Sequence, residues 1–202
     1  MKFIASVASL VMGIILFTGC QSSDDAQVEI KMKSNEEQKE IADTYTYDDY
    51  KKVFEEAVSE ANKFDEDEEL TKWIIRTLAQ EKLYYETDLT DEQVKDSARK
   101  DMEEDKVWKS IATEDYGVSV TETEVDNYIN EGPDSVDSPQ MKAYADALGL
   151  SIEELNHDFD RDLYEKNVLW LKLKPKLEKK YGTNDNNEQV EKYEEEVAEQ
   201  LN

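Results

Sequence analysis

Few side chains in this sequence have the types and spacing that bond-making chemistry requires. His157 is the only histidine, so a metal site with several imidazole ligands cannot be formed, although one histidine could still act in catalysis. The aspartates in Asp158–Asp162 alternate as they do at the start of a calcium-binding EF-hand loop. That loop needs a glycine where Leu163 stands and a final carboxylate where Leu169 stands. We therefore predict no metal site here and a solvated His157.

The acidic run Asp65–Glu69 is the other candidate for cation binding. Its carboxylates could hold calcium loosely, but such residues are also typical of the first turn of a helix, where the backbone dipole favours negative charge. The sequence contains no G-x-S-x-G motif, no phosphate-binding loop and no paired cysteines. We accordingly predict a protein that is not an enzyme and that holds no cofactor or metal.

Cys20 is the only cysteine, so an internal disulfide is impossible, and its position indicates a different chemistry. Lys2 and the mostly apolar run Phe3–Phe17 are typical of an export signal. Residues 17–20 read Phe-Thr-Gly-Cys and resemble the lipobox of bacterial lipoproteins, with phenylalanine at the position where leucine is commonest.

The lipobox resemblance implies that the chain is cut before Cys20 and that the thiol becomes diacylated. Two acyl chains are enough for stable attachment, so the implied location is the outer face of the cell membrane. The alternatives are a plain secretory signal or an uncleaved membrane helix with an incidental cysteine. The apolar run is marginal in length for a membrane span.

The charge balance is strongly acidic. Asp and Glu number 50 against 24 Lys and Arg, which gives a net charge of −26. Such a surface repels phosphate backbones, so we predict no binding of nucleic acid. It could attract basic polypeptides or divalent cations, or it could simply be a well-solvated surface that resists aggregation.

The composition predicts an all-α protein. Hydrophobic residues make up 38% of the chain, which has 6 Gly, 3 Pro and no convincing run of alternating β-branched residues. Three segments carry a capping box, in which a Ser or Thr and a Glu or Gln three residues later satisfy each other's backbone N–H groups. These boxes begin at Thr90, Thr121 and Ser151. Further helix starts are predicted at Thr46, in the acidic run at 65–69 and at Ser138-Pro139.

The chain divides into four segments. Residues 1–19 are predicted to be a lipoprotein signal peptide, and residues 20–44 a flexible acidic tether. Residues 45–182 are predicted to form a single helical domain, and residues 183–202 a polar linker with a thinly amphipathic helix. Glycines at 117, 132, 149 and 182 are predicted to end helices inside the domain.

Two details of the domain concern its longest helices. The half of the helix from Thr90 that precedes Lys106 is highly charged and has few apolar residues. This composition predicts that this half projects from the domain and contacts few other residues. The helix from Ser151 is predicted to continue to Pro175, which should bend or break it because proline lacks a backbone donor and crowds the preceding turn.

The stretch from Ile111 to Gly182 resembles the helical N-terminal region of SurA-like periplasmic chaperones and PrsA-like extracellular foldase lipoproteins. The resemblance is carried by Tyr116–Val118 with Val120–Asp126, and by Ala145–Leu150 with the entry Ser-Ile-Glu-Glu at 151–154. The helical hairpin Tyr50–Leu83 is similar to the opening helices of that family. The resemblance implies a multi-helix SurA-N or trigger-factor-C-like fold. Those families usually carry a β-rich parvulin isomerase domain, and no segment here supplies one.

The resemblance implies transient binding of unfolded or exported polypeptides, as a holdase without isomerase activity. The alternative is an adaptor lipoprotein of an envelope, sporulation or secretion assembly with one defined partner. The candidate peptide-binding residues are aromatics, which offer a large contact area at little entropic cost. They are Tyr84, Tyr85, Trp108, Tyr128, Tyr144 and Trp170. Core packing is the competing interpretation for each of them.

Overall fold

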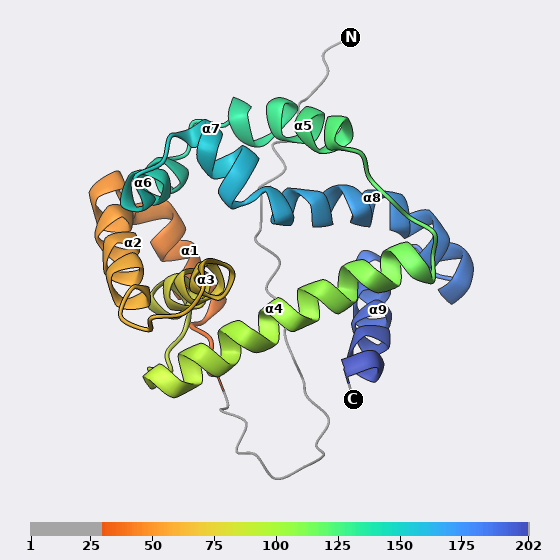
Figure 1. The fold of residues 1–202 in the computed structure, drawn as a ribbon, viewed down its shortest axis with the longest axis horizontal. Helices are drawn as coiled ribbons and strands as arrows, with labels where there is room; N and C mark the ends of the chain where they lie inside the picture. Colours follow the sequence, from red (N-terminus) through yellow and green to blue (C-terminus); the bar gives the residue numbers. More distant parts are fainter. Residues whose placement is uncertain (1–29, 202) are drawn as a thin grey trace.

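The computed structural model describes residues 30–201, and these are helical apart from loops and one isolated bridge between Met32 and Tyr85 (Figure 1). This confirms the predicted all-α class. The α-helices are α1 Asn35–Thr44, α2 Tyr47–Ala61, α3 Glu68–Tyr84, α4 Asp91–Glu114, α5 Glu122–Glu131, α6 Pro139–Leu148, α7 Ile152–Glu154, α8 Arg161–Tyr181 and α9 Asn186–Leu201. A 3-10 turn, η1, spans Pro133–Ser135, and a π-helical turn, η2, spans Leu155–Phe159.

The predicted helix starts are confirmed. Thr90, Thr121 and Ser151 each accept from the backbone N–H three residues on, and the side chain at that position accepts from the cap backbone. Thr46 forms a further capping box with Asp49. Each box satisfies donors that the first turn of a helix would otherwise leave without a partner.

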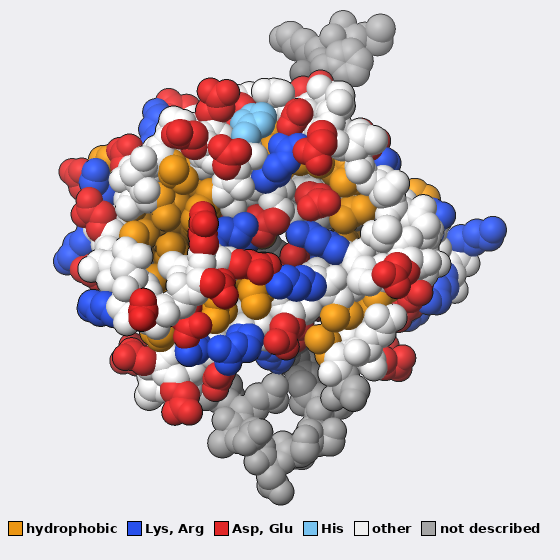
Figure 2. All heavy atoms as spheres, viewed as in Figure 1, with side chains coloured by type: hydrophobic (Ala, Val, Ile, Leu, Met, Phe, Trp, Pro, Cys, Tyr) orange, Lys and Arg blue, Asp and Glu red, His pale blue; other side chains and the backbone are white. Residues whose placement is uncertain are grey.

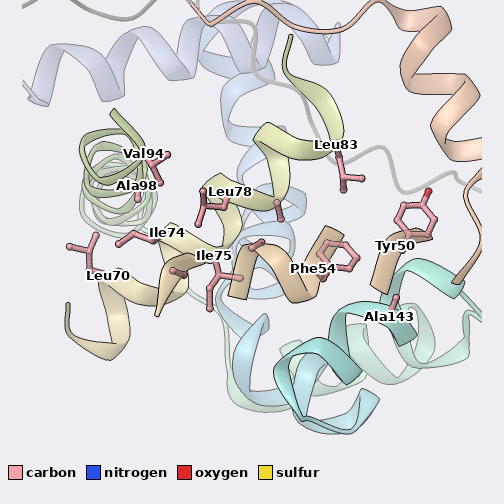
Figure 3. Close-up of a cluster of buried hydrophobic side chains, with 13 residues drawn as sticks. Tyr50, Phe54, Leu70, Ile74, Ile75, Leu78, Leu83, Val94, Ala98 and Ala143 are labelled. Atoms are coloured by element: carbon pink, nitrogen blue, oxygen red, sulfur yellow. The ribbon is translucent and has the colours of Figure 1, made fainter. Parts of the chain in front are cut away.

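The first lobe is a hydrophobic core formed by α2, α3, α6 and the first half of α4 (Figure 3). Ile74 of α3 and Ala57 of α2 lie at its centre with no exposed surface. Phe54 of α2 packs on Tyr144 of α6, with ring centroids 4.7 Å apart. The core is assembled from helices that mostly follow each other in the chain.

The second lobe is formed by the second half of α4, α8 and α9. Leu173 and Leu177 of α8 and Tyr193 of α9 are fully buried in it. A smaller cluster of Val125 and Ile129 from α5 with Tyr164 from α8 lies beside it. Because α4 contributes to both lobes, it joins them along one side, and α7, η2 and α8 join them along the other (Figure 1).

Three predictions about these elements are wrong. The tether was expected to stay flexible to residue 44, but Ser34 caps α1, and Lys33 donates to the carbonyls of Lys82 and Leu83. The first half of α4 does not project, because Val94 and Ala98 are buried against α3.

The third correction concerns the helix from Ser151. It is interrupted at η2, where the N–H of Asp160 donates to the carbonyl of Leu155, whereas α8 runs through Pro175 unbroken to Tyr181. No helix among residues 30–201 has the length and apolar character needed to cross a membrane. The predicted signal peptide, Cys20 and residues 20–29 lie outside the described residues.

Candidate functional site

Charged side chains meet where α3 and α4 face η2 and α8. We call this group the charged seam: Lys72 and Arg76 from α3, Asp105 and Lys109 from α4, and Asp160, Asp162, Glu165 and Lys166 from the start of α8. Figure 2 shows acidic and basic side chains alternating across the centre of this face. The seam lies between the two hydrophobic lobes and crosses from one to the other.

Arg76 has the most buried charged side chain of the seam, with 6% of it exposed. Its guanidinium donates to both carboxylate oxygens of Asp162 at 2.8 Å and to Asp160 at 2.9 Å. It also donates to the carbonyl of Phe159 at 3.3 Å, and the ring of Trp73 lies 5.0 Å away. A planar guanidinium suits this arrangement because it can bind a carboxylate with two parallel hydrogen bonds.

The two aspartates beside Arg76 respond in opposite directions. Burial opposes ionisation of Asp162, but the hydrogen bonds and charges of Arg76 and Lys72 outweigh it and hold its pKa well below the usual range. Burial of Asp160 is the larger effect, so its pKa is raised despite Arg76. Split pKa values can mark acid–base pairs, but here both carboxylates already bind Arg76, as in a structural ion-pair network.

The π-helical turn positions the second half of the seam. Lys72 donates to the carbonyl of Phe159 at 3.1 Å, so this helix end is capped by side chains from α3. Asn156 is fully buried within η2, where it donates to Asp134 at 2.8 Å and accepts from Tyr164 at 2.9 Å. Sequence reasoning missed both Arg76 and Asn156, because a lone Arg or Asn inside an apolar stripe does not reveal a distant partner.

His157 is only partly solvated, because its side chain also contacts Asp134. Its side chain is 23% exposed, and Nε2 lies 3.0 Å from Asp134. The alternating aspartates do not surround a common point, since Asp160 and Asp162 face Arg76 and Asp158 is exposed. Among residues 30–201, no group of three or more His, Cys, Asp or Glu side chains is arranged to hold a metal ion.

Two carboxylates lie one turn apart on α4: Asp105, which belongs to the seam, and Asp101. Asp105 binds Lys109 at 2.7 Å and Lys166 at 3.2 Å, which ties α4 to α8. One turn earlier, burial raises the pKa of Asp101 to about 7, and the neighbouring charge of Glu104 adds to the effect. Lys100 and Lys166 lower this pKa but do not offset burial.

A hollow of about 320 Å³ opens beside the seam, between the start of α5 and the start of α8. Val120 and Val125 form its apolar part, and Lys72, Arg161, Asp158 and Glu165 are among its polar residues. Arg161 is engaged there by Asp126 at 2.7 Å and Glu122 at 2.5 Å. The hollow therefore has mixed charge and little apolar surface.

The six predicted aromatic residues do not form one surface. Tyr84 and Tyr144 pack on the first lobe, and Trp108 and Trp170 belong to the second. Tyr128 of α5 packs on Tyr164 of α8, and Tyr85 pairs with Met32. Trp108 is 5% exposed and lies 5.0 Å from the ring of Tyr193, in agreement with the core-packing interpretation and not with peptide binding. Its side chain is used in packing. The other five are half-buried.

The described surface is poor in exposed hydrophobic side chains. The large ones that are clearly exposed in residues 30–201 are Val136 and Leu171, each at 58%, and Leu201 at 39%. Val136 follows η1, Leu171 lies on α8 and Leu201 lies on α9. No protein-family model, curated protein or solved structure matches the chain.

Proposed function

We propose that the protein is a non-catalytic binding protein, anchored to the outer face of a membrane through Cys20, that engages one defined polypeptide partner. The observation that carries this proposal is the small number of large hydrophobic side chains that are clearly exposed in residues 30–201. A protein that holds many unfolded chains needs a broad apolar groove, whereas the described residues expose three separate large hydrophobic side chains. Adaptor-like binding to a specific partner does not require such a groove to be open.

The charged seam supports the same proposal. Its carboxylates and cations are joined to one another, with Arg76 and Asp105 both nearly buried. Side chains that are already paired hold the two lobes together and are poorly placed to act on a substrate. Excess acidic charge on the remaining surface favours a partner with a complementary basic surface, because opposite potentials speed encounter.

A chaperone-like holdase is the second candidate, because two helical lobes joined by long helices are similar in outline to the arm or cradle implied by the SurA-like resemblance (Figure 1). The holdase needs a broad hydrophobic surface for unfolded chains, whereas the large hydrophobic side chains clearly exposed in residues 30–201 are three. The two candidates therefore make opposite predictions for unfolded clients.

The test combines two measurements on the full-length, membrane-anchored protein. The first is suppression of aggregation of a chemically unfolded model enzyme, and the second is chemical cross-linking in cells followed by purification. We expect no suppression at equimolar ratio and one cross-linked partner at fixed stoichiometry. Suppression of several unrelated unfolded proteins would favour the holdase and overturn the adaptor, and the absence of both results would overturn binding altogether.

The anchor is tested separately by Cys20→Ser. This variant should lose incorporation of labelled palmitate and move from the membrane to the soluble fraction. Retention in the membrane without label would show that the apolar run at 3–17 itself spans the bilayer. The binding proposal would survive that result, because it depends on the helical body.

A further inference from the structure

The second lobe contains an apolar groove that is occupied by a helix of the same chain. Trp108, Ile111 and Ala112 of α4 form one wall, and Leu169, Leu173 and Leu177 of α8 form the other. Tyr193 of α9 fills the space between them with no exposed surface. Its hydroxyl donates to the carbonyl of Trp108 at 2.8 Å.

The contact made by α9 is narrow. Its buried residues are Gln189, Tyr193 and Val197, which recur every four residues and form a single stripe. The oxygen Oε1 of Gln189 is buried without a hydrogen-bond partner, and Glu194 is half-buried. Burying polar groups without full compensation costs free energy, so apolar burial along this stripe is partly offset.

The position of α9 makes it separable from the rest of the fold. Gly182 takes a left-handed conformation at the end of α8, and a short polar linker leads from it into α9. No residue of α9 belongs to the core of the first lobe, and in Figure 1 the helix lies below α8, away from α2 and α6. Asp105 and Lys166 join α4 to α8 independently of α9. α9 packs on α4 and α8 of the second lobe, and a helix that is held by one lobe only can open locally.

We propose that α9 is a displaceable occupant of this groove, and that the partner binds by placing an amphipathic helix, with a carboxylate at the position of Glu196, where α9 now lies. The inference rests on the proposed function and names the surface used. It explains how a protein with a closed surface can bind an apolar segment, because the internal helix covers the site until the partner replaces it. Helices bind in such grooves through apolar anchors spaced by three or four residues.

The groove specifies the chemistry of the incoming helix. A large aromatic side chain is needed where Tyr193 lies, between Trp108 and Tyr116 at centroid distances of 5.0 and 5.8 Å. A carboxylate is needed three residues later, because Glu196 accepts from Tyr116 at 2.7 Å and binds Lys180 at 2.5 Å. A small apolar residue follows at the position of Val197. The motif is therefore aromatic-x-x-Glu-apolar.

Displacement can be measured with a fluorescent peptide that has the sequence of residues 186–201, added to the full-length protein. In the wild-type protein the tethered α9 competes at a high effective concentration, so the peptide should bind weakly. A variant with Tyr193→Ala and Val197→Ala in the protein weakens the internal competitor and leaves the groove intact. We expect it to bind the peptide at least tenfold more tightly. A matched variant with Glu191→Ala and Glu195→Ala, at exposed positions of α9, should bind like wild type.

The specificity of binding is tested at the rim of the groove. Adding Lys180→Ala to the weakened variant should lower peptide affinity, whereas Lys179→Ala, next to it and also exposed, should not. Circular dichroism must show that the weakened variant loses no more helix than α9. If it unfolds as a whole, or stays folded and binds the peptide no better than wild type, α9 is an ordinary core helix and the proposal is overturned.

Two results separate this inference from the proposed function. A defined partner that cross-links in cells equally well to the wild type and to Lys180→Ala would preserve the function and overturn the groove. Concentration-dependent dimers of the wild-type protein, seen by light scattering and abolished by Tyr193→Ala, would show that a second copy supplies the incoming helix. That result would overturn the assignment of a foreign helix.

Discussion

The region around Arg76 and the region around Asp101 bury charge in opposite ways. Arg76 is met by two carboxylates and a carbonyl at distances between 2.8 and 3.3 Å. Asp101 faces Glu104, Lys100 and Lys166, and burial dominates, so its pKa rises to about 7. The phenol of Tyr85 also lies near enough to Asp101 for burial and that charge to raise its own pKa to about 12.

The difference indicates which side of the molecule opens more easily. The buried charge of Arg76 is compensated by the carboxylates that it binds at the start of α8. This connection between α3 and α8 therefore stays intact at neutral pH, where Asp162 is ionised. The side formed by α4 and α9 contains carboxylates whose burial favours the protonated form, including Glu194. We therefore expect opening to begin at α9 while the Arg76 connection remains.

The largest expected effect is the loss of Arg76. Substitution Arg76→Met leaves Asp160 and Asp162 buried with only Lys72 nearby, and removing one partner of a buried ion pair costs about 3–5 kcal/mol of unfolding free energy. The measurement is urea-induced unfolding at pH 7.

Arg161→Met is the matched control for this change. It removes ion pairs with Glu122 and Asp126, whose side chains are 88% and 44% exposed, so it should cost about 0–1 kcal/mol. Equal losses in the two variants would contradict the view that Arg76 is the compensated connection between the lobes.

A smaller and pH-dependent effect is expected at Asp101. Its folded pKa of about 7 lies above the usual 3.8, so the unfolded chain loses its proton first as pH rises. Below about pH 4 both states are protonated and the residue has no effect on stability. Between about pH 4 and 7 it should reduce stability by at most about 1.4 kcal/mol per pH unit, and above pH 7 the loss is constant.

Asp101→Asn should remove this loss. We expect the variant to match wild type near pH 4 and to unfold at higher urea concentration at pH 8. Asp96→Asn, with a carboxylate that is 69% exposed on the same helix, should leave the pH dependence unchanged. A variant at position 101 that is destabilised at pH 8 would show that the ionised carboxylate has a partner that stabilises it.

The smallest effect is expected at Glu194. Burial raises its pKa from 4.5, Glu104 adds to the rise and Lys166 opposes it, so docking of α9 becomes less favourable as pH rises through the docked pKa. Glu194→Gln should slow hydrogen exchange of the α9 amides at pH 7.5, by less than Asp101→Asn stabilises the fold. Glu195→Gln, at an exposed position, is the control. Faster exchange in Glu194→Gln would indicate that its carboxylate helps to hold α9.

The sequence predicted the helices better than their contacts. Capping boxes depend on residues three apart, so Thr90, Thr121 and Ser151 could be assigned from the chain alone. The tether prediction failed because Ser34-x-x-Glu37 is a further capping box, in a segment with few apolar residues. The polar composition of that segment favours a tether, whereas its local capping signal favours a helix start.

The candidate site could not be predicted in the same way. Arg76 lies in the apolar stripe of α3, and its partners are more than 80 residues away in the chain. In the π-helical turn that precedes Asp160, Asn156 donates to Asp134, and no local sequence pattern predicts that contact. The aromatic type of Trp108 and Trp170 made them candidate peptide-binding residues in the sequence. Their contact with Tyr193 of α9 is visible only in the structure.

The length of α4 has a consequence for any partner that touches both lobes. Its 24 residues, at about 1.5 Å each, make a rod roughly 36 Å long with no loop between its two ends. Since motion of one lobe relative to the other would have to bend this rod, the distance between them is preset. For a partner that spans both lobes, the second binding surface is already at a fixed distance from the first. The complex therefore loses less conformational entropy when it forms than it would with a hinged protein.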